Sequence, residues 1–500
     1  MKRSKKFVLY LSLIVMCMVL LSLGQERGPY LESDSYSYMD IRNIITMPLY
    51  VIFLRLHQLA FGMDNYLGAV VISQTLLISV CVVLFVAYLR KSLNLSLPIT
   101  FLATLLSMMP FCIKLPEHTA AQEILTEALA YPLWYIFALF LLKMIWEKKM
   151  TSFVGAFVSA WLLSLTRNQM QLAYGFLALA VVYILCVKCY RKGWLKSWNK
   201  KIIGGIGAVI LALLICLTGI LFTSGTNQGI LSFIQFVESN NDTGIQQEET
   251  EESTDSKTEE TDEGLYQNIT TSQFTWAIFW RAIYSADPGD AAYIEDPYVR
   301  YFYEKMMDYA VSTGNHESVQ PMYLRIWNDI LESCGAIGHY VVEIPDEIAA
   351  EEIFTEQETV DINVCASIIN RVILTHHPWN YIRVTLKLMM GGLVSAIFFS
   401  NERFYTLCFI IAYSMFLLSF ILLGLGIRWK VDRKYLTLMG MNQTLVVGLV
   451  TVTNLIFAGM QRYLIYDFGL FYTAMLLLLV QVGKAWYHSK NRSDKECRRF

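Results

Sequence analysis

The sequence has little charge for its length. Only 16% of its 500 residues are Asp, Glu, Lys or Arg, whereas soluble domains carry about 25%. The spacings GxGxxG, GxxxxGK[ST] and HExxH are also missing, so nothing indicates a dinucleotide fold, a P-loop ATPase or a zincin. A net charge of -2 leaves no basic surface for nucleic acid. These absences exclude a soluble enzyme, a disordered protein and a nucleic-acid-binding protein.

Cysteine is present but does not form the pattern of a disulfide framework. Most of the 10 cysteines lie in or beside apolar runs. Cys186 and Cys189 form a CxxC without a second pair, which is a poor zinc site. Only Cys334 and Cys365 lie in a long polar segment, and the sequence leaves open whether these two form a disulfide.

Apolar residues dominate, at 55% of the chain, and they fall in runs of about 20, the length that spans a bilayer. We therefore predict an all-α polytopic membrane protein with about ten transmembrane helices. The predicted spans are 7–23, 66–89, 97–113, 128–146, 151–166, 170–187, 202–223, 404–427, 435–459 and 464–483. The apolar stretch 384–400 is predicted to be a re-entrant or interfacial helix, because an eleventh crossing would place the basic loop 428–434 outside.

The distribution of Lys and Arg predicts the orientation. More than half of the 40 Lys and Arg residues fall in the short segments that this topology places inside, as the positive-inside rule requires. Both termini are then cytoplasmic, and the protein is a multi-pass protein of the plasma membrane. The first apolar run, 7–23, is longer than the core of a usual signal peptide, so we expect it to remain as a helix.

The polar segments predict five parts of the chain. These are a seven-helix membrane module at 1–223, an acidic flexible linker at 224–264, a mainly helical outer-face domain at 265–403, three membrane helices at 404–485 and a basic cytoplasmic tail at 486–500. The linker is inferred from the run of Asp and Glu within it, which cannot bury a core. The outer-face domain is inferred from aromatic residues such as Trp276, Phe279 and Tyr303.

Two carboxylates lie just beyond the first predicted helix, in Glu32-Ser33-Asp34. Such a pair can hold a hard divalent cation through oxygen, and one carboxylate can accept a proton from an attacking hydroxyl. A solvated loop beside the membrane explains the same residues. The following stretch, 47–61, is apolar with interspersed Arg55 and His57, which is typical of a helix lying on the membrane surface.

A second group of polar residues precedes the fourth predicted span and comprises Glu117, His118, Glu123 and Glu127. Thr119 and Gln122 have the spacing of a capping box, which predicts a helix that begins there. Glu123 and Glu127 would then share one helix face and line a site or bind a metal. Stabilisation by the helix dipole is the simpler explanation of acids at a helix start.

These features resemble the GT-C membrane glycosyltransferases. The acidic pair Glu32 and Asp34 is similar to the modified DxD motif of their first outer loop, and the long loop follows the seventh predicted helix as it does in that fold. Leu165-Thr166-Arg167 at an outer helix end and Arg462-Tyr463 before a late span resemble further features of bacterial members.

The resemblance implies transfer of a sugar from a polyprenyl-phosphate carrier to an envelope glycan, lipid or protein acceptor on the outer face. Asp34 would be the catalytic base and Glu32 would support it. Any divalent cation, Mg²⁺ or Mn²⁺, would bind to the same two carboxylates. The donor phosphate would bind to Arg167, Arg462 and Arg42, because a guanidinium fits phosphate bidentately. The tail of the polyprenyl carrier would lie in an apolar groove that is open to membrane lipid.

Two other classes remain open. Oligosaccharide polymerases and ligases of the cell envelope also have about ten helices and a long outer loop, and Arg371, His376 and His377 would then carry the function. A transporter is disfavoured, because transporters bury polar groups at mid-membrane and the predicted spans are nearly free of charge.

Overall fold

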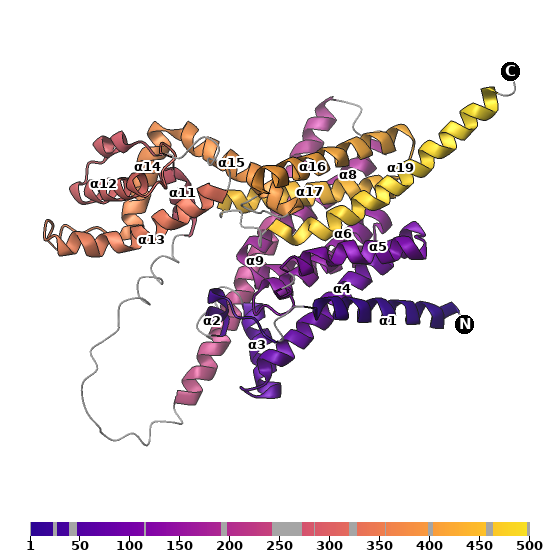
Figure 1. Cartoon of the computed structure of the whole chain (residues 1–500), viewed down its shortest axis with the longest axis horizontal. Helices are drawn as coiled ribbons and strands as arrows, with labels where there is room; N and C mark the ends of the chain where they lie inside the picture. Colours follow the sequence, from indigo (N-terminus) through magenta and orange to yellow (C-terminus); the bar gives the residue numbers. More distant parts are fainter. Residues whose placement is uncertain are drawn as a thin grey trace. The chain divides into compact units, whose positions relative to one another are not determined.

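The computed structural model describes residues 2–23, 28–39, 48–114, 117–191, 198–242, 273–284, 286–319, 328–355, 357–398, 404–456 and 464–497. Arg42, Arg462 and the acidic run of the predicted linker lie outside these residues. Within the described ranges the regular structure is helical, and one isolated bridge joins Tyr30 to Glu123. The chain divides into two compact units, whose helices are drawn in Figure 1.

Among the described residues, seven helices are long and apolar enough to cross a membrane. They are α4 (Tyr66–Leu93), α6 (Glu127–Glu147), α8 (Leu172–Arg191), α9 (Trp198–Asp242), α16 (Tyr405–Arg428), α17 (Arg433–Ile456) and α19 (Phe468–Cys497). Each coincides with a predicted span, and the protein is a helical membrane protein. The other three predicted spans coincide with α1 (Lys2–Leu21), α5 (Leu97–Met108) and α7 (Met150–Thr166). The 17 residues of α7 rise only about 25 Å, so the number ten stays a prediction.

The first unit comprises the described residues within 1–249, 414–448 and 465–500. At its centre α6 packs against α4 and α7, and it buries large aromatic side chains such as Trp134, Tyr135 and Phe137. Lys148 adopts a left-handed backbone conformation (φ 55°) and ends α6. The turn is therefore tight, and α7 begins two residues later beside the end of α6.

Two short helices precede α4. Helix α2 (Ser33–Met39) contacts α3 (Pro48–Phe61). Helix α3 buries Tyr50, Val51 and Leu54 and exposes Leu56, Leu59 and Phe61. The exposed apolar side chains are what a helix on a membrane surface would present to lipid, and this placement stays a prediction.

The second unit comprises the described residues within 250–413 and 449–464. Its helices α11 (Gln273–Tyr284), α12 (Pro297–Ser312), α13 (Asn328–Ala350), α14 (Ile362–His376) and α15 (Pro378–Ile397) surround one apolar core. Trp276, Phe279 and Tyr303 belong to this core. Cys334 and Cys365 are free thiols that donate to the carbonyls of Trp280 and Val360.

Helix α15 covers most of the stretch predicted to be re-entrant or interfacial. It is not among the seven candidate spans found in the described residues. Its Arg383 and Lys387 side chains bind the buried Glu317 carboxylate at 2.6 and 2.7 Å. These ion pairs tie the first half of α15 to the rest of the second unit, while its relation to a membrane stays a prediction.

Candidate functional site

The loops that follow α1 and α5 are joined through their backbones. The Tyr30 amide donates to the Gln122 carbonyl at 2.8 Å, and the Ile124 amide donates to the Tyr30 carbonyl at 3.0 Å. The predicted helix start at Thr119 is therefore wrong, and α6 begins at Glu127. Gln122 does accept from the Thr119 amide at 2.8 Å, as in a capping box. The chain then extends to pair with Tyr30, so Glu123 and Glu127 do not share a helix face.

Buried side chains hold the second of these loops in place. Gln74 of α4 is fully buried, and its amide donates to the carbonyls of Ala121 and Glu123 at 2.9 and 3.0 Å. The Tyr50 hydroxyl donates to Gln74 at 3.1 Å, and the Thr119 hydroxyl donates to the carbonyl of Leu21 at the end of α1 at 2.8 Å. Buried backbone groups need such partners, so these bonds fix the positions of His118 and Glu123.

An acid–base cluster forms where the two loops meet, and we call Glu32, Lys114, His118 and Glu123 the loop cluster. The Lys114 ammonium lies 2.7 Å from Glu32 Oε1 and 2.8 Å from Glu123 Oε1. His118 Nε2 lies 3.0 Å from the same oxygen of Glu123, and its ring stacks on Tyr30 with 3.9 Å between centroids. Burial works to lower the pKa of Lys114, but Glu123 and Glu32 outweigh it and leave that pKa above its ordinary value.

Three members of the loop cluster have the arrangement of metal ligands. One ligand atom each of Glu32, His118 and Glu123 lies within 4.8 Å of the others. Two carboxylates and an imidazole suit Zn²⁺ or Mn²⁺. The sequence predicted Glu32 and Asp34 as the ligands, whereas this group combines Glu32 with the second loop. A cation bound here would displace the Lys114 ammonium from the same two carboxylates.

A buried ion pair lies at the same end of the first unit. Arg167 follows α7, and its Nη1 contacts Glu127 Oε1 at the start of α6. The side chains of Arg167 and Glu127 are 8% and 2% exposed. Glu127 also accepts from the Thr126 hydroxyl at 3.0 Å. A donor phosphate would therefore share Arg167 with a carboxylate already in place.

Two tyrosines connect the ion pair with the first loop. Burial raises the pKa of Tyr38 to about 12; Glu127 adds to the shift, Arg167 opposes it and Asp34 adds a smaller part. Burial is also the largest cause that raises the pKa of Tyr50, and the charges of Glu127, Tyr38 and Glu123 raise it further. Asp34 is half-buried in the first turn of α2. Asp34, Glu127 and Arg167 thus all lie within electrostatic reach of the Tyr38 phenol.

The remaining predicted residues are not members of the loop cluster or lie outside the described residues. Glu117 is exposed, and no metal group found among the described residues includes it. Arg55 donates to the Met39 carbonyl and to Gln58. Sequence reasoning missed Lys114 and Tyr30. The available signal was that Lys114 is a cation in a predicted outer loop, where Lys and Arg are rare.

Comparison of the chain with protein-family models, with curated proteins and with solved structures found no match. The class that the fold supports is that of helical membrane proteins. The chemistry within that class rests on the residues described above.

Proposed function

We propose that the protein is a GT-C-like membrane glycosyltransferase, which moves a sugar from a polyprenyl-phosphate carrier to a cell-envelope acceptor on the outer face. The supporting observation is that Glu32 of the first loop lies in one ionic cluster with Glu123 and His118 of the second. Carboxylates of the first loop beside a second acidic loop give a site that can handle protons and phosphate at the end of a membrane helix bundle.

The role proposed for each residue follows from the charges that form and disappear during sugar transfer. The acceptor hydroxyl loses its proton to Asp34 as its oxygen bonds to the anomeric carbon of the sugar. The bond from that carbon to the carrier phosphate breaks, and its electron pair leaves with the phosphate. Positive charge must meet that phosphate. Arg167 and Lys114 are two described cations at this end of the unit that carboxylates hold.

A divalent cation fits the same site. Glu32, His118 and Glu123 would hold it, and it would supply positive charge toward the leaving phosphate. Lys114 would then be released from the two carboxylates and would be available to bind anions.

The test is sugar transfer in membranes supplied with polyprenyl-phosphate sugar. Asp34→Asn removes the basic carboxylate at almost constant size, and we expect a loss of about 10²–10⁴-fold in rate. Glu117→Gln is the matched control, because the Glu117 side chain is exposed and is not a member of the loop cluster; it should retain the wild-type rate. Transfer at the wild-type rate by Asp34→Asn would contradict the proposed role of Asp34.

One observation supports a second candidate, an oligosaccharide polymerase or ligase. In the second unit His377 Nε2 lies 2.9 Å from Oδ1 of Asp290, which is fully buried. A buried carboxylate that orients a half-exposed histidine is a common arrangement for a general base. His376 stacks on Tyr293 with 3.8 Å between centroids, and Arg371 is exposed on the same helix. Loss of product in His377→Ala but not in Asp34→Asn would favour this candidate.

A further inference from the structure

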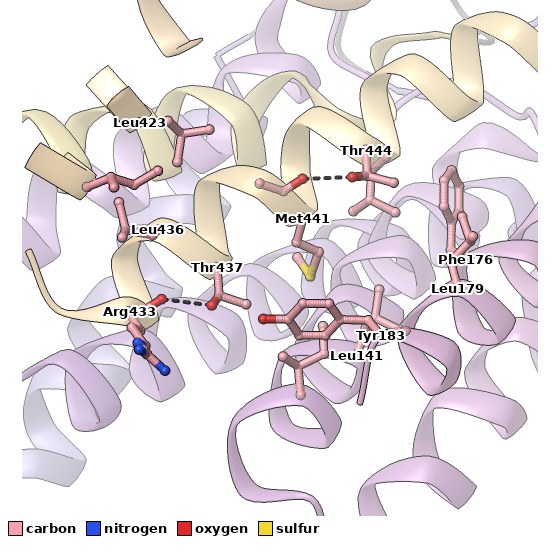
Figure 2. Close-up of a pocket in the computed structure, with 15 residues that line it drawn as sticks. Leu141, Phe176, Leu179, Tyr183, Leu423, Arg433, Leu436, Thr437, Met441 and Thr444 are labelled. Carbon is pink, nitrogen blue, oxygen red and sulfur yellow. Dashed lines mark hydrogen bonds between the residues drawn. The ribbon is translucent and has the colours of Figure 1, made fainter. Parts of the chain in front are cut away.

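The first unit contains an apolar cavity of about 580 Å³ between α6, α8, α16 and α17. Its walls include Leu141 of α6, Phe176 of α8 and Met441 of α17. In Figure 2 the Tyr183 hydroxyl points toward Thr437 and Arg433, whereas Phe176 lies on the opposite side of the ring. The cavity is therefore apolar along most of its wall, and Arg433, the one charged residue in its described lining, lies at one end.

The order of residues along α17 determines which part of the cavity wall is polar and which is apolar. Arg433, Thr437 and Met441 are spaced by four residues, so they lie along one face of the helix. The charge comes first, a hydroxyl follows one turn later, and the thioether follows after another turn. This order matches a molecule with an anionic head group and an apolar chain.

Arg433 and its neighbour Lys434 differ in the contacts that their side chains make. Lys434 donates to the Ser92 carbonyl at 3.0 Å and lies over the Trp146 ring. The Arg433 side chain is exposed and forms no ion pair within the described parts of the chain. A cation in the first turn of a helix is disfavoured by the helix dipole. An anion bound at Arg433 would remove that disadvantage, and guanidinium binds phosphate bidentately.

The position of the cavity along α6 distinguishes between lipids. Glu127 at the start of α6 belongs to the acidic ion pair, and Leu141 lies 14 residues further along the same helix. That separation is about 21 Å. A lipid with its phosphate on Arg433 therefore has its head group far from Arg167 and Glu32. A polyprenyl-phosphate donor bound in this cavity would be too far from Arg167 and Glu32 to act as the substrate of the proposed reaction.

We propose that this cavity binds an anionic phospholipid. Its phosphate contacts Arg433, and one acyl chain lies along Met441, Phe176 and Leu141. Basic pockets between membrane helices are known to bind anionic head groups. The exposed Leu179, Tyr183 and Ile427 side chains at the cavity edge give the chain an apolar opening to the bilayer.

The experiment is photo-cross-linking of the full-length protein in liposomes, using phosphatidylglycerol with a diazirine in its acyl chain. The cross-linked residues are mapped by mass spectrometry. We expect cross-links at the walls of the cavity, and about tenfold fewer when the probe is phosphatidylcholine. Arg433→Gln should reduce the phosphatidylglycerol signal to a similar extent, because it removes the charge-assisted contact. The matched control is Arg428→Gln, an exposed cation nearby that does not line the cavity.

A second variant fills the cavity without touching the charge. A Cβ added at Gly440, which lines the cavity, meets no atom within 4 Å. Gly440→Leu should fold normally and lose the cross-links, whereas Gly424→Leu, at an equally open glycine outside the lining, should keep them. Three results would overturn the proposal: equal labelling by the two lipids, no effect of Arg433→Gln, or displacement of phosphatidylglycerol by an equal amount of polyprenyl phosphate.

Discussion

The two ends of the α6–α7 pair differ in how far their paired charged side chains are exposed. At the acidic end, defined by Glu127, Arg167 and the loop cluster, Glu127 is 2% exposed and Arg167 is 8% exposed. The basic end surrounds a cavity of about 940 Å³. Its charged lining residues are Lys6, Arg90, Lys91, Lys143, Glu147 and Lys149. There Lys149 is 68% exposed, and its ion pair with Glu147 spans 3.1 Å.

This contrast indicates where chemistry should be sought. A buried charge must be matched, since an isolated one is costly, and clusters of buried titratable groups are found disproportionately at functional sites. Exposed ion pairs contribute at most about 1 kcal/mol, and basic helix ends are explained by membrane orientation. The acidic end is therefore the candidate site, and the charges of the basic end are those that the positive-inside rule predicts for a cytoplasmic side.

The largest expected difference between the ends is their accessibility from outside the cell. Single cysteines at Glu117 and Lys149, in a background without the native cysteines, would mark the acidic and the basic end. A membrane-impermeant maleimide should label position 117 in intact cells and position 149 only after permeabilisation. Both residues are exposed, so burial does not interfere. Labelling of both positions from the same side would break the comparison.

The buried ion pair should matter far more than its exposed counterpart. Arg167→Ala leaves the Glu127 carboxylate without that counter-charge, and we expect a loss of about 3–5 kcal/mol in the free energy of unfolding. Lys149→Ala should lose less than about 1 kcal/mol. Unfolding in mixed micelles measures both. The double variant Arg167→Met with Glu127→Gln should recover much of the loss, and a double variant as unstable as Arg167→Ala would show that the pair is not the cause.

The sequence predicted the seven long apolar helices because the length of an apolar run is a local property. It could not predict the Tyr30–Glu123 bridge, which joins residues far apart in the chain. Thr119 and Gln122 illustrate the limit: their local hydrogen bond forms as the spacing predicts, yet pairing with Tyr30 keeps the following residues extended. The ion pairs of Arg167 with Glu127 and of Lys114 with Glu32 could not be predicted for the same reason.

An intermediate effect is expected from the anchor of the second loop. Gln74→Leu removes the donor to the carbonyls of Ala121 and Glu123 in a fully buried position. Unsatisfied buried groups cost about 1–3 kcal/mol. Lys434→Met, which removes one half-buried contact with the Ser92 carbonyl near the basic end, should cost less. Equal melting temperatures for Gln74→Leu and the wild type would show that the loop is held by other contacts.

The smallest effect concerns Lys114. Its side chain is 43% exposed, so its ion pairs should contribute no more than about 1 kcal/mol. Because its pKa is raised in the folded protein, the contribution is fully present below about pH 10.4 and is lost as the pH rises through the higher folded value. The stability difference between wild type and Lys114→Met should be constant from about pH 7 to 9 and shrink above about pH 10.4.

The position of Arg167 after α7 has a consequence for synthesis. Glu127 begins α6, and its counter-charge is translated only after all of α6 and α7. A nascent chain that stops before residue 167 would have to insert α6 with an unmatched carboxylate at one end. We therefore expect α6 and α7 to enter the bilayer together as a pair, with the tight turn at Lys148 remaining on the cytoplasmic side. Ribosome-bound chains ending just before and just after Arg167 should differ in the protease resistance of α6.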